Sequence, residues 1–137
     1  MSQTVNVYSP AKPRQVLDAS NLAISVPQAG NTVIFSIITI GLKRLFLQVT
    51  PTGNAFAGFA VIGQATPAAP QSTLYSAAAD YTSPKGLVVG TSGDLTTLAA
   101  GSTGWIILDV TGLAIVTFTA HSAAAGGSTV TAYCGGA

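Results

Sequence analysis

The sequence predicts an all-β fold, an antiparallel sandwich of two sheets with about seven to nine strands in a jelly-roll or similar Greek-key arrangement. Short runs of Val, Ile, Thr and Phe are separated by Gly, Pro, Asn and Ser, which is the pattern of many short strands. Glu is absent, and amphipathic helical stripes with caps are missing. This many strands bury poorly in one open sheet, so we expect two layers.

The chain length fits one domain, and two proline-containing segments interrupt its strand pattern. The 137 residues are enough for a single core. We expect residues 1–14, with Pro10 and Pro13, to form an extended N-terminal arm. Residues 15–137 are expected to form one β-sandwich domain with a long loop at 65–85. Loops this long are usually functional or flexible, so each segment is either surface disorder or a contact with neighbouring subunits.

Strand signals recur along the whole domain. The stronger ones alternate apolar and polar residues at period two, and those at 15–18, 22–26, 86–89 and 95–98 are weaker or shorter. Residues 105–110 are an apolar run, as expected for a strand buried on both faces. The expected strands, in chain order, are 15–18, 22–26, 32–40, 42–50, 55–64, 86–89, 95–98, 105–110, 113–120 and 128–133.

Turn chemistry predicts two hairpins. The segment PTGN separates strand 42–50 from strand 55–64, and SAAAGGS separates strand 113–120 from strand 128–133. Glycine adopts positive φ at little cost, and Pro, Asn and Ser favour turns. We therefore expect the members of each pair to be antiparallel neighbours in one sheet.

The residues that carry chemistry are few and scattered. The single His121 ends a strand, and the single Cys134 is expected to be a small buried thiol. Asp94, Asp109 and Asp18 lie in turn-like clusters, where carboxylates bond nearby backbone N–H groups. No Cys/His spacing fits zinc and no acidic cluster fits calcium. The sequence therefore predicts a protein that is not an enzyme, with no catalytic, cofactor-binding or metal-binding residues and no cofactor.

Charge is scarce, at 7% of residues against about 25% in ordinary soluble domains. A net charge of +1 gives no argument for nucleic acid or for an anionic membrane. The apolar stretch 33–49 is interrupted by Gly41, Lys43 and Arg44, too early to span a bilayer, and the N-terminus shows no signal peptide. A surface this poor in charge is best tolerated when neighbours cover it, so we expect a component of an assembly that binds neither nucleic acid nor membrane.

Two segments resemble small β-sandwich virion proteins of tailed bacteriophages. "ILDVTGLAIVTFTAHSAAAGGSTVTAYCGGA" resembles their closing segment, in which Asp-Val-(Thr/Ser)-Gly leads to an alternating strand, a Gly/Ala/Ser loop and a last Thr/Val strand. "LFLQVTPTGNAFAGFAVIGQA" is similar to their central hairpin. The match covers residues 42–64 and 86–137, and it is one of style and spacing.

The resemblance implies a capsid cement or decoration protein. Such proteins brace the major capsid shell as dimers or trimers, so the expected partners are the major capsid protein and further copies of this chain. The protein would be made in the host cytoplasm and lie on the outer surface of the capsid. The alternative is a tail, head-fibre or collar module that binds host glycan through rings of the long loop. The candidate contact residues are Val5, Val7, Tyr8, Pro10, Pro13, Leu74, Tyr75 and Tyr81.

Overall fold

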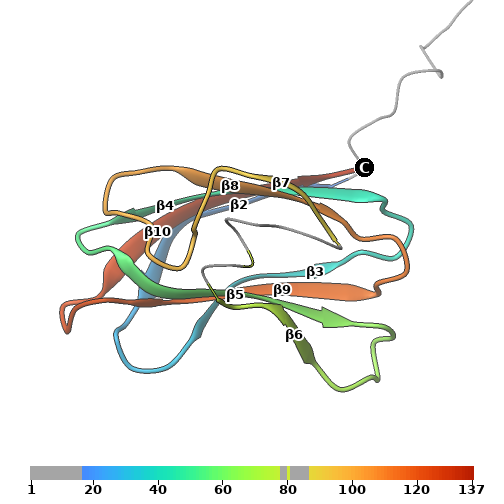
Figure 1. Ribbon diagram of the computed structural model, residues 1–137, viewed down its shortest axis with the longest axis horizontal. Helices are drawn as coiled ribbons and strands as arrows, with labels where there is room; N and C mark the ends of the chain where they lie inside the picture. Colours follow the sequence, from blue (N-terminus) through green and yellow to red (C-terminus); the bar gives the residue numbers. More distant parts are fainter. Residues whose placement is uncertain (1–16, 78–79, 81–86) are drawn as a thin grey trace, which may run out of the picture.

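Nine strands form two antiparallel sheets in the part of the chain that the computed structural model describes, residues 17–77, Asp80 and 87–137. The five-stranded sheet has the order β2-β10-β4-β8-β7, and the four-stranded sheet has the order β3-β9-β5-β6. The two sheets lie as two layers (Figure 1), which confirms the predicted all-β sandwich. The strands are β2 (Leu17–Val26), β3 (Thr32–Ile38), β4 (Arg44–Thr52), β5 (Phe56–Gln64), β6 (Ser72–Tyr75), β7 (Val88–Thr91), β8 (Gly104–Asp109), β9 (Ile115–Ser122) and β10 (Ser128–Gly136).

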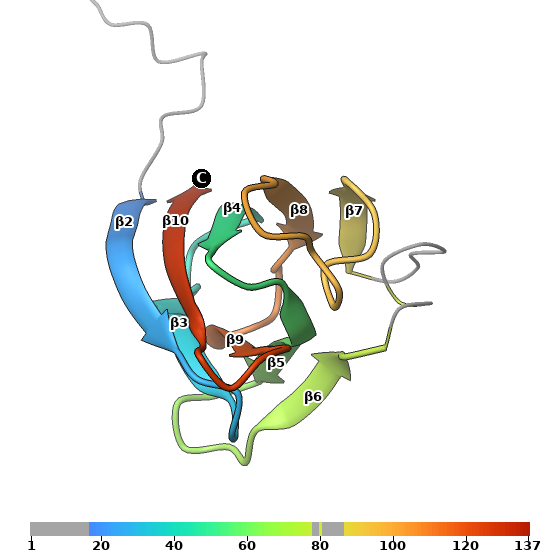
Figure 2. The same ribbon diagram turned by 90° about the vertical axis from the view of Figure 1, so that its left-hand side faces the viewer.

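Strands that follow one another in the chain mostly lie in opposite sheets. Among the strands that the structure describes, only β5 with β6 and β7 with β8 pair as consecutive neighbours. The view along the strands in Figure 2 shows β2 and β3 at one side of the sandwich and β6 and β7 at the other. This topology places residues that are far apart in the sequence beside one another on each sheet.

Both predicted hairpins are wrong in their pairing. Strand β4 pairs with β10 and β8, whereas β5 pairs with β9 and β6. Likewise β9 and β10 lie in different sheets. Each of these strands has one strongly apolar face, and crossing to the other layer lets the two apolar faces pack against each other across the core. The short polar connections are compatible with either arrangement, so turn residues alone did not distinguish them.

The core lies between the two sheets and is built largely from alternate residues of the strands. Phe59 lies 6.0 Å from Phe56 and 6.2 Å from Phe118, measured between ring centroids, and all three rings belong to the four-stranded sheet. Leu47 and Ile106 are among the buried side chains that the five-stranded sheet adds. Alternation at period two, visible in the sequence, divides core residues from outward-facing ones along β4 and β8. In β5 a register shift between Phe56 and Gly58 interrupts the alternation, so that Phe56 and Phe59 both face the core.

Three segments differ from the expected secondary structure. Strand β2 runs without a break where two pieces were expected, because an extra residue in β2 between Asn21 and Ile24 shifts the register and keeps this strand paired with β10. Residues 72–75 form β6 inside the predicted loop 65–85 and pair with β5. Residues 95–98 form a turn instead of a strand, since the Asp94 carboxylate accepts hydrogen bonds from the chain that follows it.

Candidate interaction surfaces

The single histidine and the single cysteine do not form a catalytic pair. His121 lies on β9 in the four-stranded sheet, where its Nδ1 is 3.0 Å from Asn31 Oδ1. Cys134 lies on β10 in the other sheet and is 2% exposed, which confirms the predicted buried thiol. Burial raises the pKa of Cys134 to about 12, so the reactive thiolate is scarce at neutral pH.

The aspartates are structural where the structure describes their contacts. The Thr96 N–H donates to Asp94 Oδ1 at 2.8 Å, and the Thr111 N–H donates to Asp109 Oδ1 at 3.1 Å, as predicted. The hydrogen bonds from Thr111 hold the pKa of Asp109 below its usual value. The expectation that Asp18 lies in a turn-like cluster is wrong, because this residue lies inside β2. Within residues 17–77, 80 and 87–137, no group of three or more His, Cys, Asp or Glu could hold a metal ion.

The outer surface of the four-stranded sheet carries no Asp, Glu, Lys or Arg on any of its strands. Ile38 is the most prominent residue, 70% exposed, and it pairs across to Ile115 on β9. Two residues further along the same pair of strands, Ser36 lies opposite Thr117. Their hydroxyl oxygens are 3.2 Å apart, so these two polar groups form a hydrogen bond with each other. We call this surface the uncharged face; it consists of Ser36, Ile38, Ala60, Ile62, Ile115, Thr117 and Thr119.

Two details show how closely the uncharged face is filled. A Cβ atom at Gly58 would collide with the ring of His121, so that ring covers the gap left by the glycine. The hydroxyl of Thr119 is buried and finds no hydrogen-bond partner among the described residues. Beside this face, Val33 and Ile40 extend the exposed apolar surface along the β3 edge and the turn after it. The result is an exposed surface that is largely apolar and carries no charged side chain on its strands.

The outer surface of the five-stranded sheet is aromatic instead. Phe46 on β4 and Trp105 on β8 have ring centroids 6.2 Å apart, and Tyr133 on β10 is 50% exposed. In the predicted strand 105–110, Ile106 takes the inner position, so period two turns the half-buried Trp105 outward. For the same reason strand 105–110 is not fully buried on both faces. We call this surface the aromatic face; it consists of Phe46, Gln48, Trp105, Ile107, Tyr133 and Gly135.

Charged side chains border the aromatic face. Arg44 pairs with Asp109 across β4 and β8, and the charge of Arg44 adds a small lowering to the pKa of Asp109. Asp18 on β2 pairs with Gly135 on β10. Among the described strands, every charged residue therefore belongs to the five-stranded sheet.

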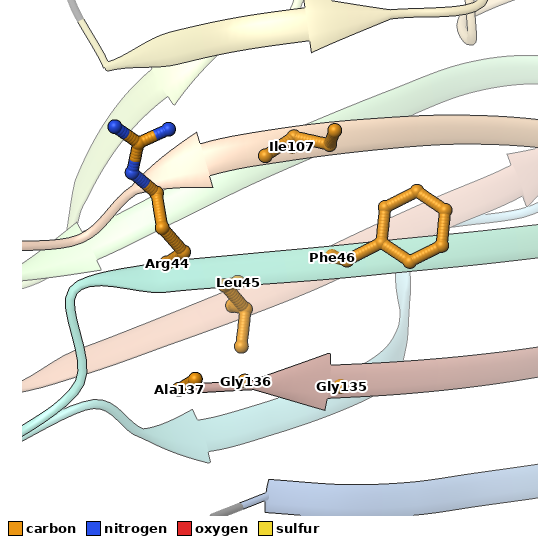
Figure 3. A pocket seen from close by; sticks show the side chains of 7 residues that line it. All are labelled: Arg44, Leu45, Phe46, Ile107, Gly135, Gly136 and Ala137. Carbon is orange, nitrogen blue, oxygen red and sulfur yellow. The ribbon is translucent and has the colours of Figure 1, made fainter. Parts of the chain in front are cut away.

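Two shallow hollows lie side by side on the aromatic face because Gly135 has no side chain between Asp18 and Phe46. The first hollow has a volume of about 340 Å³, and Figure 3 shows Phe46 and Ile107 at its wall beside the bare backbone of the terminal glycines. The second hollow has a volume of about 190 Å³, and its lining includes the polar side chains of Asp18, Gln48 and Tyr133. The first is lined by Arg44, Leu45, Phe46, Ile107, Gly135, Gly136 and Ala137, and the second by Asp18, Ala19, Phe46, Gln48, Tyr133, Cys134 and Gly135.

The described candidate contact residues do not form the expected aromatic platform. Tyr75 is only 8% exposed, and its hydroxyl accepts a hydrogen bond of 2.8 Å from the Leu87 N–H. Its ring therefore belongs to the core, which corrects the expectation of a surface ring at this position. Leu74 is half-buried and lines a separate hollow of about 390 Å³ beside β5 and β6. The remaining candidates lie outside the described residues: Val5, Val7, Tyr8, Pro10, Pro13 and Tyr81.

Comparisons with known proteins support the fold and leave the family open. No family model matches the chain, and no curated protein sequence matches it either. In the described part of the chain, no helix has the length and hydrophobicity needed to cross a membrane. The chain is similar in structure to the SPBc2 prophage-derived protein YomS, with a TM-score of 0.50 and 11% sequence identity. That match covers 92% of this chain and 100% of YomS, so the likeness extends over the whole two-sheet fold.

Proposed function

We propose that this protein is a structural component of a tailed-phage virion, a cement subunit that binds the major capsid protein and bridges neighbouring capsid subunits. The fold similarity to a prophage-derived protein supports this proposal. The strand order also supports it, because β2-β10-β4-β8 facing β3-β9-β5-β6 follows the order of a jelly roll, a fold common in viral capsids. In this function the protein is made in the host cytoplasm and sits on the outer surface of the capsid.

The uncharged face carries this proposal. A partner that covers it displaces water from Ile38 and its apolar neighbours without desolvating any charged group on these strands. Burial contributes about 25 cal/mol per Å² of apolar surface, and a standard interface covers about 800 Å² on each partner. Ordering and association costs offset much of that gain for one subunit. Repeated contacts over a shell raise the total stabilisation through avidity.

The edge of the same sheet suits self-association into the proposed dimer or trimer. Strand β3 is an edge strand among the described residues and contains neither Lys nor Pro, the residues that commonly block edge pairing. The side-chain amide of Asn21 occupies one of its carbonyl groups, with a hydrogen bond of 2.8 Å to the oxygen of Ile34. Val33 is exposed on the same strand. A second copy of this chain is therefore the other partner that we propose, beside the capsid protein.

Co-sedimentation with purified phage capsids that lack their cement protein tests the capsid function. Ile38→Asp places a charge in the centre of the contact, and we expect it to weaken capsid binding at least about tenfold, because a buried unpaired carboxylate is costly. Val89→Asp is the matched control, since Val89 is 51% exposed and lies on β7 of the other sheet. We expect this control to bind as the wild type does.

Two results would contradict the proposal at different levels. Wild-type protein that stays in the supernatant with every capsid tested rules out the cement function. Equal binding of both variants retains the function and rules out the uncharged face as its contact. Size-exclusion chromatography with mass measurement gives the oligomeric state of each variant and separates loss of self-association from loss of capsid binding.

A further inference from the structure

We propose that the aromatic face contains a second binding site, which takes a neutral saccharide. The proposal does not depend on the capsid function. Its centre is the hollow of about 190 Å³ beside Gly135, where the Phe46 and Tyr133 side chains meet the carboxylate of Asp18 and the amide of Gln48.

The register of three strands builds this hollow. Along one row, Asp18, Gly135 and Phe46 lie opposite one another on β2, β10 and β4. In the adjacent row Tyr133 lies opposite Gln48. A glycine inside a strand often marks a place where a ligand approaches the backbone closely. Here the glycine is surrounded by two rings and two hydrogen-bonding side chains, so an occupant would contact both kinds of group at once.

The chemistry of these groups fits a sugar ring. An aromatic face carries partial negative charge and packs well against the C–H groups on one side of a pyranose. The carboxylate of Asp18 accepts hydrogen bonds from hydroxyl groups, whereas the amide of Gln48 and the hydroxyl of Tyr133 both donate and accept. Binding sites commonly combine apolar walls with a few polar groups that fix orientation. A saccharide presents both surfaces, which a purely apolar ligand does not.

Charge favours a neutral ligand over an anionic one. Among the described residues that line the polar hollow, the charged group is Asp18, which repels phosphate, sulfate and carboxylate groups. Arg44 lines the neighbouring hollow, but Asp109 lies directly across from it. An apolar partner laid flat over this face would strip water from Asp18 without replacing its hydrogen bonds. Nucleic acid and lipid therefore suit this site less well than sugar.

The adjoining hollow gives room for more than one sugar unit. Both hollows share Phe46 and Gly135, and Trp105 lies next to Phe46. A linear chain can thus cross the strands from Asp18 toward Ile107. Trp105 is the only tryptophan in the chain, so its fluorescence reports directly on this face.

Fluorescence titration tests the proposal with hexasaccharides of glucose, galactose, mannose and N-acetylglucosamine, and with a sialylated and a sulfated chain for comparison. We expect at least one neutral hexasaccharide to change the Trp105 emission and the anionic chains to leave it unchanged. Tyr133→Ala and Gly135→Val should each weaken binding at least about tenfold. Gly135 has no positive φ, so valine fills the hollow without forcing the backbone into a strained conformation.

Ile38→Asp is the matched control for this site, because it changes the other sheet. We expect it to keep saccharide binding and lose capsid binding, whereas Gly135→Val does the reverse. Circular dichroism confirms that each variant is folded. The proposal is wrong if no neutral hexasaccharide binds at about 10 mM, ten times a Kd of 1 mM, or if Gly135→Val binds like the wild type. It is also wrong if Gly135→Val changes the oligomeric state alone, since that outcome assigns the face to a second copy of the chain.

Discussion

The two sheets share one core but present different outer surfaces. The uncharged face combines exposed apolar side chains with hydroxyl groups, of which those of Ser36 and Thr117 lie within hydrogen-bond distance of each other. The aromatic face is hollowed and bordered by Asp18, Arg44 and Asp109. The charged residues of the described strands are therefore not divided evenly between the two sheets. The difference suggests that one face suits a large apolar partner and the other suits a small ligand that needs hydrogen bonds.

Two glycines show how this difference arises. Gly58 pairs with His121 in the four-stranded sheet, and the histidine ring fills the space above it. Gly135 occupies a comparable position inside β10, yet its neighbours Asp18 and Phe46 leave the space open as a hollow. The same residue type thus gives a flat surface on one sheet and a concave one on the other. The neighbouring side chains decide which of the two forms.

Removing part of the common core should disturb both faces together, and it is the largest effect that we expect. Phe118 is fully buried on β9 and packs against Phe59. Phe118→Ala should lower the free energy of unfolding by about 3–5 kcal/mol, through lost burial and the cavity left behind. Urea denaturation measures this value, and Ile38→Ala is the exposed control, with a change below about 0.5 kcal/mol. Two separate unfolding transitions would contradict a shared core.

The turn between β7 and β8, which hydrogen-bonds to β5 of the other sheet, should give the next largest effect. Burial opposes ionisation of Asp94, but hydrogen bonds from Thr96 and Thr97 outweigh it and hold the pKa below the usual 3.8. Leu98, at the end of this turn, accepts a hydrogen bond from the Phe56 N–H at the start of β5. Asp94→Ala should therefore cost about 1–2 kcal/mol of stability at neutral pH.

Acid should reduce the effect of Asp94→Ala. A carboxylate whose pKa is lowered by folding stabilises the protein above its usual pKa, and this contribution disappears as the pH falls through the lowered value. Thermal unfolding of the wild type and the variant at pH 7 and at about pH 3 measures the change. A stability difference that stays constant, or grows, on acidification would show that the ionised carboxylate does not hold the turn.

Much of each face was predictable from alternation along single strands. The pattern of β4 places Leu45, Leu47 and Val49 inward and Phe46 and Gln48 outward, as the structure confirms. The hydrogen bonds of Asp94 and Asp109 were also predictable, because an aspartate in a turn bonds the N–H groups that follow it. These features depend on interactions within a few residues.

Pairing between distant strands was not predictable in the same way. The polar hollow needs Tyr133 beside Gln48, and that contact depends on β10 pairing with β4. The two predicted hairpins instead paired β4 with β5 and β10 with β9. Nothing in the local turn shows which sheet the next strand joins. Tyr75 was assigned to a surface loop because of the Pro and Ala residues around it. Its burial follows from its place on β6 opposite the buried Val61 of β5, and its hydroxyl accepts a hydrogen bond from Leu87, twelve residues further along.

The smallest expected effect tests how complete the uncharged face is. The buried hydroxyl of Thr119 has no partner among the described residues, so Thr119→Val removes an uncompensated polar group and keeps the shape of the side chain. We expect the free energy of unfolding to rise by about 1 kcal/mol. Thr117→Val is the matched control on the same strand and face, because its hydroxyl lies 3.2 Å from that of Ser36. It should lower stability by about 1 kcal/mol instead. If both variants lower the free energy of unfolding equally, the Thr119 hydroxyl does have a hydrogen-bond partner. The uncharged face would then bind a water molecule or a second chain at this position.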